Sequence, residues 1–231
     1  MKVKKILVFL LLCFVVLTCF SCRFVDAILG TDFSVEEDDA NDKTYSVEEI
    51  QEETNDFSVG DVLSFGKYDN ESIEWLVLDK KENKALVISR DVLFSKPYNF
   101  DDTSVTWETC TLRSYLNYGF YNTAFSEEEK KLITNSKIEN PDNPDYGTEG
   151  GNDTEDYIFL LSIEEANMYF KTDEDRSCGE EWWLRSPGCS QDSAAYVLYD
   201  GGIFSGNGDY YYVNVDRDYG VRPALWLDLN Q

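Results

Sequence analysis

The segment that decides the fold is the run IEWLVLDKKENKALVIS, residues 73–89. Its two outer parts, Ile73–Asp79 and Ala85–Ser89, are rich in the apolar and β-branched residues that strands favour. The polar stretch between them, Lys80–Asn83, has the length and composition of a short turn between strands. The segment therefore predicts a β-hairpin.

The residues on either side of the hairpin extend the pattern. Asp61 to Tyr68 alternates between polar and apolar residues, which predicts another strand. Further along, Leu112, Tyr115 and Leu116 stand at the i, i+3, i+4 spacing of an amphipathic helix.

Two capping signatures predict further short helices. Ser126 is followed three residues later by Glu129, and Ser162 by Glu165, the spacing at which the two side chains satisfy backbone N–H groups at a helix start. We expect a strand at Ile158–Leu161, a turn-rich loop from Asn140 to Asp156, and short strands with turns from Trp182 onward. The sequence predicts one α+β domain over residues 58–231, built from short antiparallel strands and a few short helices.

The first residues indicate export. Three lysines precede an apolar run from Ile6 to Leu17, which is shorter than the ~20 residues of a membrane span and has the length of a signal peptide's apolar region. Ser21-Cys22 follows, a small residue before a cysteine, which resembles a bacterial lipoprotein processing site. We expect residues 1–22 to be a signal peptide, Cys22 to carry the lipid, and the protein to be anchored at the cell envelope. A cleaved signal without lipid, or an uncleaved anchor, remains open.

The charge excludes some partners. The chain carries a formal net charge of -25, so it repels nucleic-acid backbones. Acidic residues are dense between residues 23 and 57, where few apolar residues could offset the entropy of ordering, and this predicts a disordered acidic tether.

The chain has no histidine. This excludes Ser-His-Asp and Cys-His catalysis and the His-ligated zinc sites. Downstream of Cys22 stand Cys110, Cys178 and Cys189. Cys178 and Cys189 could form a disulfide if the chain folds back at Ser186–Gly188, or could be independent thiols. Cys110 is predicted to be a small buried residue.

Three segments carry a resemblance. They are TWETCTLR (106–113), WWLRSPG (182–188) and GVRPAL (220–225). In this order they resemble an uncharacterised bacterial domain family, and the last third is similar to the C-type-lectin-like fold, which includes the formylglycine-generating (sulfatase-modifying) branch and retroelement-diversified receptors. The resemblance implies a small sheet that presents an irregular C-terminal face to ligands. We expect the tryptophans and the two arginines of these motifs, Arg185 and Arg222, to be structural.

The composition of the last third fits such a face. Its tyrosines, asparagines, aspartates and glycines are the residues that adaptable binding surfaces use. The predicted ligand-binding residues are Tyr199, Phe204, Asn207, Asp209, Tyr210, Tyr211, Asn214 and Asp216. A glycine-rich loop whose tyrosines only cover the sheet is the alternative.

A calcium site is the second hypothesis for a ligand. Asn152, Asp153 and Asp156 lie in one tight loop and offer the oxygen donors that calcium prefers. The loop lacks the EF-hand pattern and the sugar-binding signatures of C-type lectins. A solvated acidic turn explains the same residues.

We therefore expect a non-enzymatic, surface-displayed module that binds an extracellular protein or glycan and needs no cofactor beyond the calcium hypothesis. An enzyme related to the formylglycine-generating branch and a purely structural envelope protein are the alternatives. A glycoside hydrolase is allowed by the number of acids, but no two of them stand out as a pair.

Overall fold

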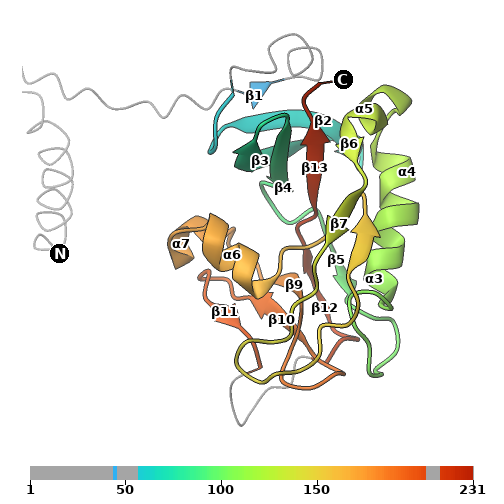
Figure 1. Ribbon diagram of the computed structural model, residues 1–231, viewed down its shortest axis with the longest axis vertical. Helices are drawn as coiled ribbons and strands as arrows, with labels where there is room; N and C mark the ends of the chain where they lie inside the picture. The colour runs from blue at the N-terminus through green and yellow to red at the C-terminus, as the bar shows by residue number, and fades with distance from the viewer. Residues whose placement is uncertain (1–43, 46–56, 207–213, 231) are drawn as a thin grey trace, which may run out of the picture. The chain divides into compact units, whose positions relative to one another are not determined.

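The computed structural model describes residues 44–45, 57–206 and 214–230. The chain divides into two units at Asn41, and all described residues belong to the second unit. This unit is an α+β domain with mostly antiparallel strands and short helices (Figure 1). No helix among the described residues is both long and apolar enough to pass through a membrane.

The first sheet has six strands in the order β1-β2-β3-β4-β13-β6. Its strands are β1 (Thr44–Tyr45), β2 (Val62–Tyr68), β3 (Glu71–Lys81), β4 (Lys84–Ser89), β13 (Ala224–Asp228) and β6 (Ile133–Thr134). The predicted hairpin is β3 and β4, whose strands extend closer to the turn than expected, with Lys81 opposite Lys84. The last strand, β13, lies between β4 and β6 and pairs with both.

The second sheet has five strands in the order β11-β10-β9-β12-β5. Its strands are β11 (Ile203–Phe204), β10 (Ala194–Val197), β9 (Trp182–Pro187), β12 (Asp218–Val221) and β5 (Phe94–Pro97). The central strand β9 is buried along its whole length. It meets β12 in parallel at Gly220, where a Cβ atom would lie 2.6 Å from the carbonyl oxygen of Glu181, so only glycine fits.

Short helices flank the sheets, and a third sheet pairs β7 (Ser136–Ile138) with β8 (Thr154–Asp156). The helices are α3 (Thr111–Ser114), the π-helical turn η1 (Tyr115–Phe120), α4 (Tyr121–Ala124), α5 (Glu127–Leu132), α6 (Ile163–Tyr169) and α7 (Asp173–Arg176). In Figure 1, α3 and α4 run along one side of the domain while α6 and α7 lie on the other. Both predicted capping boxes are present at α5 and α6, and a third, from Thr172 to Asp175, begins α7.

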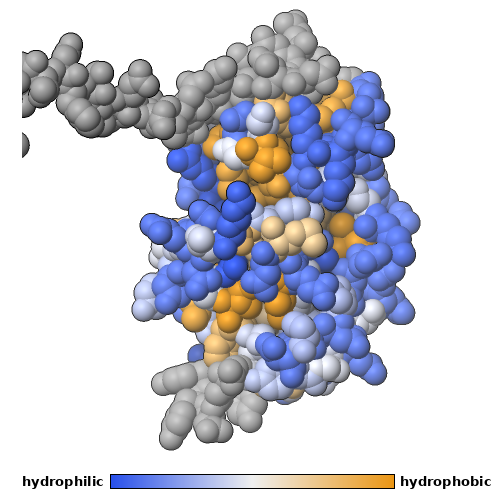
Figure 2. Space-filling view, turned by 60° about the vertical axis from the view of Figure 1, so that its left-hand side comes forward, coloured by the Kyte–Doolittle hydropathy of each residue, from blue (hydrophilic) through white to orange (hydrophobic). Residues whose placement is uncertain are grey.

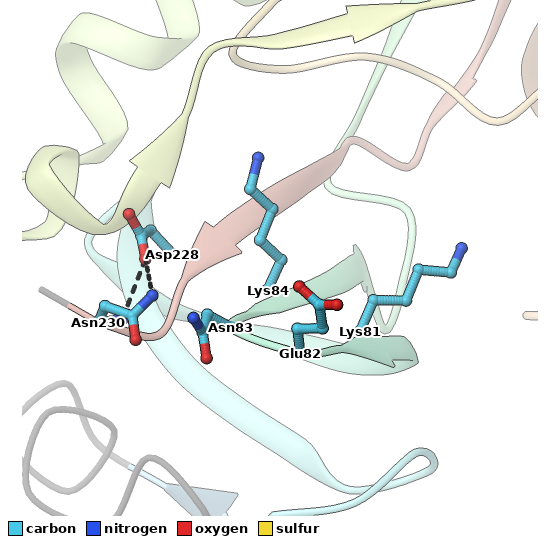
Figure 3. A pocket seen from close by; sticks show the side chains of 6 residues that line it. All are labelled: Lys81, Glu82, Asn83, Lys84, Asp228 and Asn230. Atoms are coloured by element: carbon cyan, nitrogen blue, oxygen red, sulfur yellow. Dashed lines mark hydrogen bonds between the residues drawn. The ribbon is translucent and has the colours of Figure 1, made fainter.

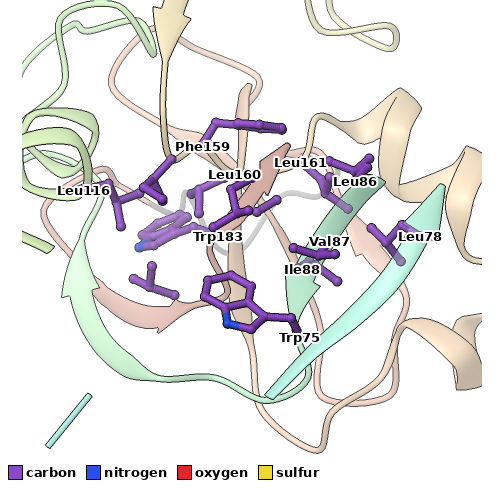
Figure 4. Packing of buried hydrophobic residues seen from close by; sticks show 14 of the residues in the cluster. Trp75, Leu78, Leu86, Val87, Ile88, Leu116, Phe159, Leu160, Leu161 and Trp183 are labelled. Atoms are coloured by element: carbon purple, nitrogen blue, oxygen red, sulfur yellow. The ribbon is translucent and has the colours of Figure 1, made fainter. Parts of the chain in front are cut away.

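One hydrophobic cluster joins the two sheets. Trp75 and Ile88 contribute to it from the first sheet, Trp183 from the second, and Leu116 from the helical run (Figure 4). The indole N–H of Trp75 donates to the carbonyl of Phe65 at 2.9 Å, so the buried ring leaves no unpaired donor. The predicted helical residues Leu112 and Leu116 are buried, and Tyr115 is half-buried.

Three local predictions differ from the structure. The expected strand at Ile158–Leu161 is a buried irregular segment with a single bridge, Phe159 to Ala224. The expected loop contains strand β8 instead. Within the predicted tether, Thr44–Tyr45 pair with β2, and Phe57 is buried beneath the ammonium group of Lys80, so ordered structure begins before residue 58. The rest of the predicted tether, the predicted signal peptide and the predicted lipidation site Cys22 lie outside the described residues.

Candidate ligand-binding surface

The structure describes four of the eight predicted ligand-binding residues, namely Tyr199, Phe204, Asn214 and Asp216. The other four, Asn207, Asp209, Tyr210 and Tyr211, lie outside the described residues. The four described residues do not form a single binding patch, because some are exposed to solvent and others are packed or hydrogen-bonded within the domain.

Tyr199 and Phe204 flank the β10–β11 turn. The Tyr199 side chain is 66% exposed, as expected of a binding residue. Phe204 instead packs its ring 5.2 Å from that of Tyr196, which also contacts the ring of Tyr219 at 4.7 Å. Phe204 is therefore part of the aromatic packing on the second sheet.

Asn214 and Asp216 lead into strand β12. The amide nitrogen of Asn214 donates to Oδ2 of Asp102 at 3.1 Å, which ties this segment to the loop after β5. Val215 between them is fully buried, so Asp216 faces solvent. Asp216 lines a hollow between β5 and α3, the β5–α3 hollow.

The β5–α3 hollow has a volume of about 640 Å³ and combines apolar walls with charged groups. Its lining residues are Lys96, Pro97, Phe100, Thr111, Leu112, Tyr115, Asp216 and Asp218. Sites that bind ligands have this character, with apolar and aromatic walls and a few polar groups that orient the ligand.

Phe100 is the most unusual of the lining residues. Its side chain is 77% exposed, although the residue before it, Asn99, is buried. The backbone around Phe100 is held in place, because its N–H donates to the hydroxyl of Thr111 at 2.9 Å and Asn99 Oδ1 accepts from the Thr111 N–H at 3.1 Å. A large aromatic ring thus projects into solvent at the edge of the hollow from a backbone that is held in place.

The aromatic wall continues at Tyr115, the first residue of η1. The ammonium group of Lys96 lies 4.4 Å from the centre of the Tyr115 ring, a cation–π contact. Burial raises the pKa of the Tyr115 hydroxyl, and nearby Tyr68 raises it further, so the hydroxyl stays protonated near neutral pH. Isolated π-helical turns such as η1 are often found at functional sites.

The acidic wall consists of Asp216 and Asp218. Asp216 lies in the turn before β12, Asp218 is the first residue of the strand, and both line the hollow. Strand β12 brings them to the hollow because Asp218 pairs with Pro97 of β5. Both side chains are exposed.

The sequence predicted Asp216 but missed the residues that it faces. Phe100 and Asp218 carry no periodic or spacing signal, and the helical spacing of Tyr115 indicated a helix and not a binding surface. Only the pairing of β12 with β5, which lie far apart in the sequence, brings them together.

A second hollow, of about 710 Å³, is formed at the tip of the β3–β4 hairpin. Its side chains are Lys81, Glu82, Asn83, Lys84, Asp228 and Asn230 (Figure 3). Of the side chains drawn, only Asn230 and Asp228 are joined by a hydrogen bond, and the lysines extend away from them. No aromatic or apolar side chain of the described part of the chain lines this hollow, and such side chains are the ones that hold a ligand by apolar contact.

Of the two alternatives for Cys178 and Cys189, the structure has the independent thiols, and Cys110 is free as well. Cys178 precedes strand β9 and Cys189 follows it. An extended strand advances about 3.3 Å per residue. A disulfide needs Cα atoms within about 7 Å of each other. The buried strand between the two cysteines therefore keeps them apart.

The predicted calcium ligands form ion pairs or hydrogen bonds with other groups of the domain. Asp153 pairs with Lys137 at 2.7 Å, and the carbonyl of Asn152 accepts from the Asn140 amide at 2.7 Å. Asp156 is fully buried with three donors around its carboxylate. Within the described residues, no cluster of three or more acidic or cysteine side chains is arranged to hold a metal ion.

The motif residues have structural roles in the described part of the chain. Arg185 is 3% exposed, forms an ion pair with Glu165 and donates to the carbonyls of Glu139 and Leu160. Arg222 is 2% exposed, lies 4.8 Å from the centre of the Trp182 ring and donates to the carbonyl of Ser89. Burial lowers the pKa of Arg222 below its ordinary value.

Residues 82–229 match the family model described as Domain of unknown function (DUF6273). The chain belongs to this family. The three motif segments and the whole β5–α3 hollow fall within the DUF6273 region. No curated protein matches the chain. No solved structure matches it either.

The DUF6273 region begins at the turn of the β3–β4 hairpin, at Glu82. Strand β3, which pairs with β4, precedes the DUF6273 region in the sequence. The six-stranded sheet therefore needs residues on the N-terminal side of the family region.

Proposed function

We propose that this DUF6273 protein is a non-enzymatic ligand-binding module displayed at the bacterial cell envelope. The β5–α3 hollow, together with the C-terminal segment that leads into β12, would hold the ligand. In this proposal the domain has a C-type-lectin-like architecture, a small sheet with an irregular C-terminal face, and the ligand is an extracellular protein or glycan.

The observation that carries the proposal is the exposure of Phe100. Burying an aromatic side chain contributes about 2 kcal/mol or more, so an exposed ring beside a hollow can anchor a partner. The ring is 77% exposed and its backbone is held by Thr111. On the face shown in Figure 2, hydrophilic side chains predominate and the hydrophobic ones gather in separate patches.

The enzyme alternative has less support. An enzyme of the formylglycine-generating type depends on a pair of cysteines in its active cleft. Cys178 and Cys189 are free and lie at opposite ends of strand β9. No specific observation favours this chemistry.

The experiment compares two aromatic residues of equal exposure. Phe100 and Tyr118 are each 77% exposed, but only Phe100 lines the hollow. Purified wild type, Phe100→Ala and Tyr118→Ala are screened against arrays of host surface proteins and glycans. Ligand capture is expected to be lost in Phe100→Ala and kept in Tyr118→Ala, with equal melting temperatures. Equal capture by both variants would refute the site.

The proposed anchor is tested separately. Cells that express the protein are grown with an alkyne-tagged fatty acid, and the label is expected on wild type and not on Cys22→Ala. Label on the Cys22→Ala protein, or none on wild type, would contradict lipidation at Cys22.

A further inference from the structure

The charges around the β5–α3 hollow are not balanced. Asp216 and Asp218 form no ion pair and no side-chain hydrogen bond with any other described residue, although both line the hollow. Other acids of the domain are used differently. Asp156 pairs with Arg113, and Glu165 pairs with Arg185. The acidic wall therefore has free acceptor capacity.

Among the described residues, Lys96 is the one cation that lines the hollow, and its ammonium group lies over the Tyr115 ring. Next to the hollow, Asp101 and Asp102 are exposed and add further negative charge. The chain as a whole has a net charge of -25. Both the local and the long-range field therefore attract cations.

The apolar residues that line the hollow fit the aliphatic stem of a basic side chain. Lysine and arginine pack their aliphatic stems along apolar surface while the charged head remains near polar groups. Phe100 and Pro97 supply this apolar surface. A guanidinium group also stacks on an aromatic face and forms paired hydrogen bonds with a carboxylate, which favours arginine.

We propose that the β5–α3 hollow recognises arginine or lysine side chains in a basic segment of an extracellular protein. The stem of the basic side chain lies against Phe100, and its head reaches Asp216 and Asp218. This inference rests on the proposed function, since it specifies the ligand of the same hollow. A neutral glycan fits less well, because it would desolvate two carboxylates without compensating their charge.

The test uses two fluorescein-labelled peptides of glycine, serine and arginine, one of which carries citrulline in place of arginine. Citrulline has nearly the same shape as arginine but no charge. Binding to the full-length protein is measured by fluorescence anisotropy. The arginine peptide is expected to bind at least about tenfold more tightly than the citrulline peptide at ~50 mM salt, and less so at ~300 mM salt.

A matched pair of variants separates the hollow from the general negative charge. Asp216→Asn/Asp218→Asn removes two charges at the hollow, and Glu164→Gln/Glu174→Gln removes two exposed charges on and near α6 and α7. The first variant is expected to lose most of the preference for arginine, and the second to keep it. Equal effects of both variants, or equal binding of the two peptides, would overturn the inference.

The outcome also distinguishes this inference from the proposed function. If a neutral glycan is captured and capture depends on Phe100, the module binds ligands at the hollow but the cationic ligand is wrong. If no capture of any ligand depends on Phe100, both proposals fail.

Discussion

Nε of Arg113 donates to Oδ1 of Asp156 at 2.6 Å, and the Asp156 side chain is 0% exposed. The same carboxylate accepts from the indole N–H of Trp107 at 2.9 Å and from the Thr154 hydroxyl at 2.8 Å. Two residues of the TWETCTLR motif, Trp107 and Arg113, thus hold strand β8 against the start of α3. The motif therefore joins two segments that are distant in sequence.

Loss of this ion pair should destabilise the domain strongly. Arg113→Ala leaves a buried carboxylate without its cation, and the expected loss in free energy of unfolding is about 3 kcal/mol. Urea denaturation measures the loss. The control is Lys131→Ala, which removes an exposed ion pair with Glu128 on α5 and should cost less than about 1 kcal/mol. Similar losses in the two variants would contradict the structural role of Arg113.

Asn143 should be irreplaceable by aspartate. It is 2% exposed, and its amide nitrogen donates to the carbonyls of Pro187, Gly188 and Ser205 at 2.8, 3.1 and 3.0 Å. Asn143→Asp replaces the donor with a carboxylate oxygen that faces these carbonyls, so we expect a loss of at least about 3 kcal/mol.

Thermal unfolding measures this loss. The control is Asn135→Asp, a change of the same kind at an exposed position, which should shift stability by about 0.5 kcal/mol or less. A melting temperature of Asn143→Asp near that of the control would show that Asn143 does not join the loop to the end of β9.

Two glycines with positive φ should respond differently to alanine. Gly60 has a φ of 98° and nothing within 4 Å of an added Cβ, so Gly60→Ala should cost about 1 kcal/mol from backbone strain alone. Gly201 has a φ of 88°, and an added Cβ would lie 1.7 Å from the carbonyl oxygen of Asp173. Gly201→Ala must therefore displace α7 or the β10–β11 turn. Chemical denaturation should show a clearly larger loss for Gly201→Ala, and equal losses would mean that α7 does not pack closely here.

The three described cysteines should differ in reactivity. Burial raises the pKa of the Cys110 thiol to about 12 from an ordinary value of 9.0. Cys178 and Cys189 are half-buried. With an aromatic disulfide reagent at neutral pH, Cys178 and Cys189 should react in the native protein and Cys110 only after unfolding. Peptide mapping identifies the labelled residues, and native labelling of Cys110 would be inconsistent with its burial.

The same shift predicts how stability depends on pH. The Cys110 thiol ionises in the unfolded chain above about pH 9 but in the folded protein only near pH 12. Its contribution to stability is therefore complete below pH 9 and is lost as the pH rises from 9 to 12. Cys110→Ala should show a smaller decrease in melting temperature over this range. If the melting temperature of Cys110→Ala falls as much as that of wild type, the loss of stability comes from other groups. Tyrosines such as Tyr98, whose pKa is also raised by burial, would then be its source.

Local signals in the sequence were sufficient for the hairpin and two helix starts. The strand-forming residues of Ile73–Ser89 and the serine–glutamate spacings at Ser126 and Ser162 act over a few residues, so the chain forms the same elements that the patterns indicate. The run Ile158–Leu161 failed as a strand because apolar content reports burial, and here the buried segment is irregular.

The candidate site depends on contacts that local patterns do not contain. Asp216 and Phe100 line the same hollow because β12 pairs with β5, and no periodicity predicts that pairing. Phe204 matched the composition of a binding surface but packs against Tyr196, since composition does not reveal which side of a short strand faces the core.

The position of β13 determines the order in which the domain can be completed. It fills the space between β4 and β6, so the hydrogen-bonding edge of β4 stays open until residues 224–228 are in place. A chain in which β13 has not yet docked has an unpaired strand edge, which exposes it to proteases and to aggregation. Docking of β13 therefore joins β4 to β6 and closes the six-stranded sheet.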